Sequence, residues 1–318
     1  MAGSIITRGW DPELLAPGLA QVVYAEGEND LSVYKQCVDM KPASISPLKT
    51  GVKTHRIAGL GVLEDVGETT PTAYDAPKPG SVKEMNYRSF GLAVAFSRIV
   101  KDDELYGILG EVAGELGKAY DRHRNISVAT LYENFFANTY YTDAESVQPL
   151  GSASHTCIKA TNVLRSNILP VSKEFSLSSV TEMLVKMSRQ KDDLGLPSSA
   201  LKSGQSVKLL IQPEDKATFI KLFAGGNGLD PTNDTNAPNP LKNWGNTFTS
   251  VENNWIDKVG SARYWFALLP ETNYWMIDRT PLESKVYTEN SNDVLVHRVF
   301  CRYGIHIRHW TGVYGSGN

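Results

Sequence analysis

The fold is decided by residues 82–138, which read VKEMNYRSFGLAVAFSRIVKDDELYGILGEVAGELGKAYDRHRNISVATLYENFFAN. Within this stretch a strand pattern gives way to a helix pattern. Residues 82–96 alternate apolar and polar side chains with the period of two that is typical of a strand. From Asp103 to Asn138 the apolar side chains recur close to the helical period. They are Leu105, Leu109, Val112, Leu116, Ala119, Ile126, Leu131 and Phe135.

The strand pattern belongs to a β-arm that we predict over residues 50–98. Its first strand covers residues 52–62, and a stiff turn rich in proline covers residues 67–80. In the return strand the apolar residues change from odd to even positions near Ser89, which predicts a bulge or a twist. Neither the arm nor the long helix can bury its own apolar surface. We infer that a neighbouring copy of the chain covers them; the alternative is an ordinary hairpin packed on its own domain.

The long helix is predicted to begin after an N-cap at Asp102 and to run for about 36 residues, or roughly 54 Å. A break is most plausible at residues 125–127. Four glycines fall on one face of this helix, and each weakens a helix by roughly 0.5–1 kcal/mol relative to alanine. They are Gly107, Gly110, Gly114 and Gly117. This stripe predicts that another backbone crosses the helix at close range; the alternative is a solvent-facing, frayed first half.

The composition is that of an ordinary globular protein, with 318 residues, 41% hydrophobic and 21% charged, and a net charge of −3. Lys and Arg form no cluster, so sequence-specific binding of nucleic acid is not expected. The cysteines Cys37, Cys157 and Cys301 lie far apart, which suits a reducing compartment. No signal peptide and no apolar run of about 18 residues is present. The pattern predicts a soluble protein made in a cytoplasm.

The remaining segments give weaker but usable signals. Residues 1–49, broken by Pro12 and Pro17, indicate an extended arm with one short helical turn. Ser176 is a good N-cap for a helix over residues 177–191, and Pro213 opens a helix that ends at Phe223. A long polar surface loop is predicted over residues 225–246. Further strands are predicted over residues 207–211, 248–256, 262–269, 274–278 and 294–307.

No residues are predicted to be catalytic, to bind a cofactor or to bind a metal, so the chain is not expected to be an enzyme. Three pairs were weighed as metal ligands: His155 with Cys157, His297 with Cys301, and His306 with His309. His306 and His309 are three residues apart, so on a strand they would point to opposite faces. His297 and Cys301 would share a face but lie about 13 Å apart. Neither pair is therefore expected to bind one metal ion. Neither a phosphate-binding loop nor a Gly-x-Ser-x-Gly elbow occurs.

The order of these elements resembles that of the major capsid (head) protein of tailed bacteriophages, whose fold is shared with herpesvirus capsid floors and encapsulins. The run from Gly151 to Thr156, followed by Ser166 and Asn167, is similar to a small-residue, Ser-His, Ser-Asn run after the spine helix of such proteins. The ending, residues 294–307 and 309–315, is similar to their last strand and tail. Many of those proteins begin with a removable scaffolding segment of about a hundred residues; here the arm starts near Met1, so we expect that scaffolding is either a separate protein or a segment already cut away.

The resemblance implies an α+β capsid fold in five parts. These are an N-terminal arm (1–49), an extended two-stranded E-loop (50–98), the spine helix and peripheral domain (99–170), a mixed α/β axial domain (171–288) and C-terminal strands that return to the peripheral domain (289–318).

The resemblance further implies a structural protein that assembles through pentamers and hexamers into an icosahedral head shell. The expected partners are other copies of the chain, a scaffolding protein, a portal and a decoration protein. The shell encloses double-stranded DNA without sequence-specific binding, contacts no membrane, and is assembled in the host cytoplasm as part of the virion. The alternatives are an encapsulin-like cellular compartment and an oligomeric enzyme.

Overall fold

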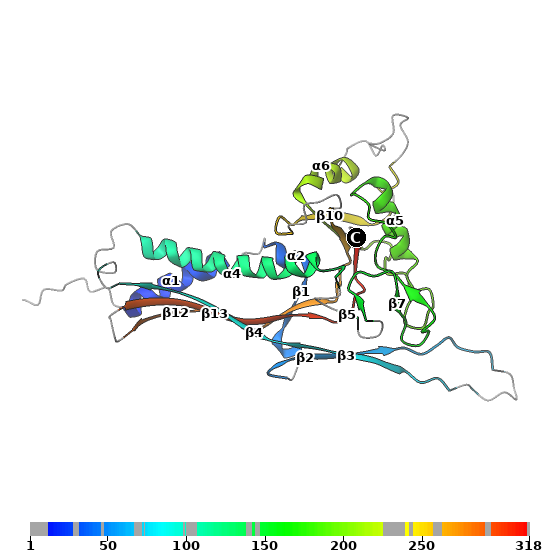
Figure 1. The fold of residues 1–318 in the computed structure, drawn as a ribbon, viewed down its shortest axis with the longest axis horizontal. Coiled ribbons are helices and arrows are strands. Elements are labelled where there is room, and N and C mark those ends of the chain that lie inside the picture. The colour runs from blue at the N-terminus through cyan, green and yellow to red at the C-terminus, as the bar shows by residue number, and fades with distance from the viewer. Residues whose placement is uncertain are drawn as a thin grey trace, which may run out of the picture.

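The computed structural model describes residues 12–27, 32–45, 48–66, 72, 74–97, 99, 107–137, 142–143, 147–224, 239–241, 244–256, 263–289 and 294–316. Over these residues the chain forms two four-stranded sheets, a long helix and a projecting hairpin (Figure 1). The predicted α+β class is confirmed.

The first sheet has the strand order β1-β12-β13-β4 and supports the long helix. Its strands are β1 (Asp39–Pro42), β12 (Tyr274–Glu289), β13 (Val294–Ile307) and β4 (Arg88–Phe96). Strands β12 and β13 pair antiparallel along their length, with register irregularities between Asp278 and Glu283. We predicted that β12 ends near Asp278, which is wrong. The strand passes Pro281 because this proline lies in the irregular stretch, where a missing N–H is tolerated.

The second sheet has the order β10-β9-β11-β14 and carries the shorter helices. Its strands are β10 (Thr247–Glu252), β9 (Ser206–Ile211), β11 (Trp265–Leu268) and β14 (Val313–Ser316). The cap at Ser176 is confirmed, because its Oγ accepts a hydrogen bond from Ser179 N at 3.3 Å at the start of α5 (Leu177–Ser188). The helix after Pro213 is also confirmed, as three successive turns: η2 (Pro213–Asp215), α6 (Lys216–Phe219) and the π-helical η3 (Ile220–Ala224). Most of the predicted loop 225–246 lies outside the described residues.

The hairpin consists of β2 (Gly51–Ala58) and β3 (Lys78–Asn86), and it projects from the body of the molecule (Figure 1). The strand pattern breaks at Tyr87, after which β4 pairs with β13 rather than with β2. The predicted irregularity near Ser89 is therefore confirmed, as a change of pairing partner. The first strand ends at Ala58, earlier than predicted.

The long helix α4 covers Ile108–Glu133, which is 26 residues and thus about 39 Å. It is shorter than predicted, because it begins after Gly107 at φ +71° and ends at the cap Asn134. The predicted N-cap Asp102 lies outside the described residues. The predicted break is wrong: α4 is continuous, and Ser127 Oγ donates to the helix carbonyl of His123 at 2.8 Å. Such back-bonding satisfies a polar side chain without interrupting the helix.

A second helix, α1 (Pro12–Gly27), crosses α4 and contacts β12. The prediction of an extended arm is wrong over this segment. Pro17 lies inside this helix, where a proline normally disrupts helical structure. Leu19 and Val23 (5% and 0% exposed) nevertheless pack on the α4 side chains Leu109, Ala113 and Leu116. This packing outweighs the helix hydrogen bond that proline removes.

The crossing explains part of the glycine stripe. A Cβ on Gly117 would lie 2.6 Å from the carbonyl oxygen of Val23, so the α1 backbone does pass there at close range. A Cβ on Gly114 would make an ordinary contact with Val22 at 3.8 Å, and one on Gly110 would meet nothing within 4 Å. The predicted close approach is therefore confirmed at Gly117 and wrong at Gly110.

The shorter elements connect these units. They are α2 (Val33–Cys37), η1 (Ala43–Ile45), β5 (Thr142–Asp143), β6 (Gln148–Pro149), β7 (His155–Thr156) and β8 (Leu164–Arg165). The pairs β5–β6 and β7–β8 are small antiparallel hairpins that follow α4.

Candidate functional site

The outer half of the hairpin exposes large hydrophobic side chains. Leu63 and Tyr74 are fully exposed, at 97% and 102%. The others are Ile57, Leu60, Val62, Val66 and Val82. Scattered apolar residues are normal on a protein surface, but a concentration on one slender element marks an interaction site. The hairpin therefore presents a surface that a second molecule must cover.

The base of the same hairpin is anchored to its own chain. Val52, Tyr87 and Ile277 form a small buried cluster, 1%, 8% and 0% exposed. Thr54 Oγ1 is hydrogen-bonded to His306 Nε2 at 2.8 Å, and Arg56 pairs with Asp193. The interpretation as an ordinary packed hairpin thus holds for the base. Further out, Asp75 pairs with Lys159 at 2.7 Å, but the large apolar side chains of the outer half remain exposed.

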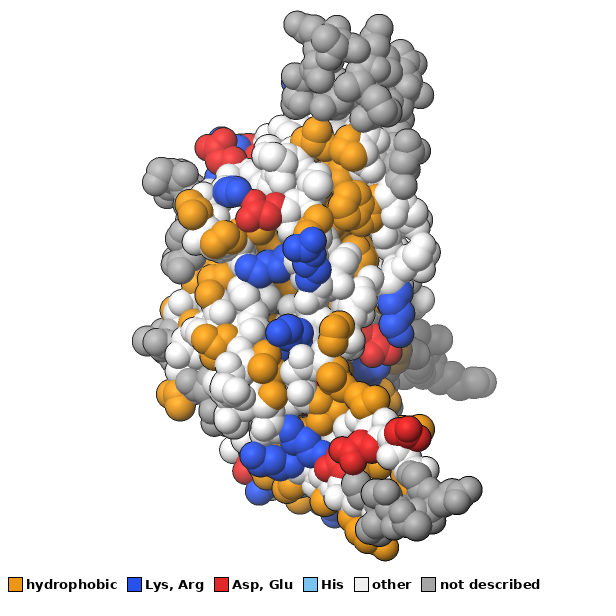
Figure 2. Space-filling view, turned by 90° about the vertical axis from the view of Figure 1, so that its right-hand side faces the viewer, with side chains coloured by type: hydrophobic (Ala, Val, Ile, Leu, Met, Phe, Trp, Pro, Cys, Tyr) orange, Lys and Arg blue, Asp and Glu red, His pale blue; other side chains and the backbone are white. Residues whose placement is uncertain are grey.

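Strand β4 offers a second surface, the free edge of the first sheet. In the part of the chain that the structure describes, β4 pairs with β13 and nothing pairs with its other edge. Leu92 on this strand is 50% exposed. An unpaired edge with exposed apolar residues is a template for association. Figure 2 shows that hydrophobic side chains are also spread over one end of the molecule, between Lys and Arg residues.

The run from Gly151 to Thr156 meets Asn167 in space, and this contact holds the fold together. Asn167 is fully buried; its Oδ1 accepts from Ser152 N at 3.0 Å, and its Nδ2 donates to the carbonyls of Leu150 (2.9 Å) and Val313 (3.2 Å). One side chain thus joins the segment after α4 to the last strand, β14. Buried amides of this kind are costly to remove because each partner would lose its hydrogen bond.

His155 belongs to the same junction. Its ring stacks on Trp310 with centroids 4.2 Å apart, and the guanidinium carbon of Arg165 lies 4.9 Å from the Trp310 ring centroid. A Cβ on Gly151 would lie 2.4 Å from the ring of Phe135. Glycine is required at this position because the aromatic ring at the end of α4 occupies the space.

A buried ion pair that the sequence did not reveal lies in the middle of α4. Arg124 is 2% exposed and pairs with Asp278 of β12. Its guanidinium lies 4.4 Å from the ring centroid of Tyr120, 5.0 Å from that of Tyr303 and 5.4 Å from that of Tyr34. Burial, the largest single influence, disfavours the charge, but Asp278 together with the phenol groups of Tyr120 and Tyr34 outweighs it and holds the pKa of Arg124 above its usual value. The pair fixes the long helix on the sheet.

The pairs weighed as metal ligands bind other groups. His155 Nε2 lies 3.2 Å from the Leu150 carbonyl, and Cys157 Sγ donates to the carbonyl of Asp192. His297 Nε2 lies 2.8 Å from Ser284 Oγ, and His309 Nδ1 lies 2.6 Å from Thr311 Oγ1. Among the described residues, no three His, Cys, Asp or Glu side chains gather as metal ligands would.

The cysteine thiols are unreactive in this fold. All three are free and buried. Burial raises the pKa of Cys37 to about 12 and that of Cys301 to about 11. A thiol with such a pKa stays protonated at neutral pH and is a poor nucleophile. Within the described residues, none of the helices is long and apolar enough to cross a membrane.

Comparison with known proteins gives both a family and a fold. The sequence profile of the family described as "Phage capsid protein" matches residues 88–316. None of the curated proteins compared with the chain matches it. Solved structures match at low identity, which shows the fold alone.

Three of these solved structures illustrate the range. The capsid of cyanophage P-SCSP1u has a TM-score of 0.56 at 9% identity, over 87% of this chain and 86% of that one. The capsid of the native GTA particle has a TM-score of 0.55 at 11% identity, over 100% and 94%. The virus-like particle of Pyrococcus furiosus has a TM-score of 0.51 at 10% identity, over 96% and 98%.

Proposed function

Because this chain belongs to the phage capsid protein family, we propose that its copies assemble through pentamers and hexamers into the icosahedral head shell of a tailed bacteriophage. It is a structural shell protein of the virion, and its first partner is another copy of itself. The observation that carries this conclusion is the match of the family profile across residues 88–316. The family implies a structural role and no enzymatic one.

The geometry of the subunit agrees with such a role. The hairpin is anchored at its base and exposes Leu63 and Tyr74 at its outer end. The edge of β4 adds a second unsatisfied surface. A closed shell needs several modest, symmetric interfaces per subunit, and both features supply such contacts.

The encapsulin-like compartment is the weaker alternative. The likeness in fold extends to a virus-like particle from Pyrococcus furiosus, so fold alone does not decide between the two. The family profile favours the phage shell. The oligomeric enzyme is not supported by any group of side chains described above.

The finer assignments rest on the resemblance. A scaffolding protein, a portal and a decoration protein are proposed as further partners, and double-stranded DNA as the enclosed cargo. The hairpin is proposed as the E-loop, α4 as the spine helix, and the sheet around β9 as the core of the axial domain. The pairing of β12 with β13 favours placing residues 274–289 in the peripheral domain.

The test is assembly of the purified full-length chain, alone and with a scaffold from the same genome. Closed particles or capsomers in electron micrographs are the expected result, and a compact monomer at high concentration would overturn the proposal. Deleting Thr69–Gly80 should leave the subunit folded but prevent or weaken shell closure. Unfolding of this variant would instead place the outer hairpin in the subunit's own core.

A milder variant separates these outcomes. Leu63→Ser removes one fully exposed apolar side chain and disturbs no contact within the subunit. Its thermal unfolding should match that of the parent, while its yield of particles should fall.

A further inference from the structure

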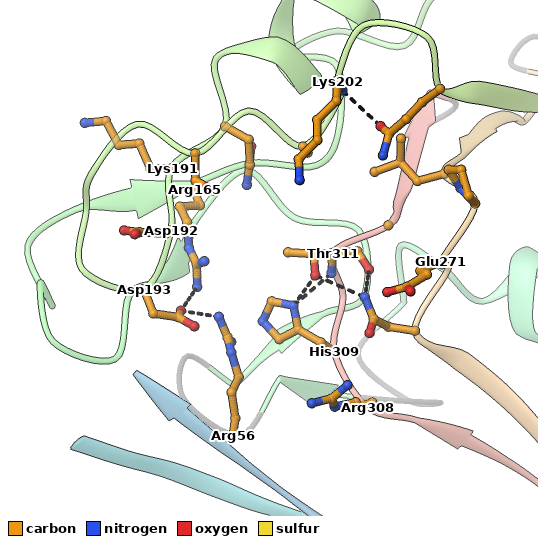
Figure 3. A pocket seen from close by; sticks show the side chains of 18 residues that line it. Arg56, Arg165, Lys191, Asp192, Asp193, Lys202, Glu271, Arg308, His309 and Thr311 are labelled. Atoms are coloured by element: carbon orange, nitrogen blue, oxygen red, sulfur yellow. Dashed lines mark hydrogen bonds and ion pairs between the residues drawn. The ribbon is translucent and has the colours of Figure 1, made fainter. Parts of the chain in front are cut away.

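A cavity of about 560 Å³ lies beside the base of the hairpin (Figure 3). Separate parts of the chain form its walls: β2 through Arg56, β8 through Arg165, the segments around Lys202 and Glu271, and the segment after β13 through Arg308. This volume is in the range of small-molecule sites. The cavity is distinct from the exposed outer hairpin and from the edge of β4.

The charges that line the cavity are unequal. Its lining includes five Lys and Arg residues and three Asp and Glu residues, which leaves a surplus of two positive charges. Asp193 is shared by Arg56 and Arg165. Asp192 directs one carboxylate oxygen to the backbone N–H groups of Leu194 and Leu196, both at 2.9 Å. Glu271 remains as an opposing charge. Among the described residues, neither Lys202 nor Arg308 takes part in a salt bridge, and Arg308 lies over the Trp275 ring, 5.6 Å from its centroid.

Buried hydrogen-bond donors in the wall point to the same ligand class. Gln190 is 6% exposed and Arg165 is 4% exposed. In the described chain neither Gln190 Nε2 nor Arg165 Nε has a hydrogen-bond partner. Both atoms are shielded from solvent, so a bound acceptor reaches them only if the side chains of the wall shift, and an unpaired buried donor favours such a shift. An oxyanion supplies several acceptor atoms and also neutralises the surplus charge.

We propose that this cavity binds a multivalent oxyanion of the phosphate class, which ties the base of the hairpin to the body of the subunit. The ligand would accept from Lys202 and Arg308, which lie at opposite edges of the cavity (Figure 3). Because Arg56 lies on β2, an anion in the cavity restrains the direction in which the hairpin leaves the subunit. The inference rests on the cavity alone and does not depend on assembly.

The test is calorimetric titration of the full-length protein with inorganic pyrophosphate, at an ionic strength held constant with sodium chloride. The parent protein should bind saturably. Lys202→Glu should weaken binding at least tenfold and Arg308→Gln several-fold, because each variant removes a positive charge that would bind the anion. Both residues are exposed, so their replacement spares the core. Lys221→Glu is the matched control: it reverses the charge of an exposed lysine outside the cavity and should change binding less than twofold.

Hydrogen exchange gives the second readout. Pyrophosphate should slow amide exchange in β2 of the parent and of Lys221→Glu, and should leave β2 of Lys202→Glu unchanged. The proposal is overturned if binding is not saturable, if Lys202→Glu and Lys221→Glu lose affinity equally, or if bound pyrophosphate leaves β2 exchange unaltered. A failure of the purified chain to form particles would bear on the proposed function and not on this site.

Discussion

Replacing Gly117 by alanine tests the helix crossing, which is the tightest backbone contact of α4. A Cβ at this position would lie 2.6 Å from the carbonyl oxygen of Val23 and 2.9 Å from Glu26 Cβ. Ordinary contact begins at 3.4 Å, so the crossing would have to open by about 0.8 Å at a backbone atom. Overpacking of this kind costs about 1–3 kcal/mol. The gain in helix propensity, roughly 0.5–1 kcal/mol, offsets only part of it.

Gly110→Ala is the matched control on the same helix. A Cβ there meets nothing within 4 Å, so only the propensity gain remains and this variant should be more stable than the parent by roughly 0.5–1 kcal/mol. The two variants make the same chemical change on one helix, seven residues apart. They should therefore shift stability in opposite directions.

Hydrogen exchange of α1, residues 12–27, is the suitable assay, because a local opening of α1 need not change the global unfolding of a large chain. Gly117→Ala should exchange α1 amides faster by about tenfold or more, and Gly110→Ala should leave them unchanged. Equal protection of α1 in both variants would refute the reasoning. It would mean that α1 does not cross α4 where the structure places it.

Three other predictions concern buried polar groups. Asp278→Ala leaves Arg124 buried without its carboxylate, and the free energy of unfolding in urea should fall by about 3–5 kcal/mol. An unchanged urea midpoint would argue against the pair. Asn167→Ala removes the side-chain partner of Ser152 N and of the Val313 carbonyl, at about 1–3 kcal/mol each, while the Leu150 carbonyl keeps its contact with His155 Nε2; it should lower the melting temperature strongly, whereas Asn134→Ala, which loses only one bond within its own helix, should not. Burial, aided by neighbouring positive charge, lowers the pKa of His306 to about 4. Neutral His306 therefore contributes on the order of 3 kcal/mol to the free energy of unfolding above pH 6.5, and this contribution is lost as the pH falls towards 4. Amides of β2 should exchange faster over this window, and His306→Gln should flatten the pH profile.

The elements with local signals were predictable from the sequence. The cap at Ser176, the apolar run of β9 and the helical period of α4 depend on residues close together in the chain. The change of the apolar residues from odd to even positions also predicted where the return strand is interrupted. The order of such elements was enough to suggest the capsid fold, although identities to solved structures are about 10%.

What could not be predicted depends on distant partners. Arg124 looks like a solvated residue of a helix until Asp278, 154 positions away, is placed beside it. The helix over residues 12–27 forms on the surface of α4, so Pro17 misled the local interpretation. The cavity beside the hairpin combines residues from Arg56 to Gly312, and no short motif announces it.

The break at Tyr87 separates the hydrogen-bond ladder of the hairpin from that of the main sheet. Tyr87 itself is held in place, because its N–H donates to the Thr50 carbonyl at 3.1 Å and its side chain is buried with Val52 and Ile277. A load that a neighbouring subunit places on the hairpin is therefore expected to reach the main sheet through this anchored residue.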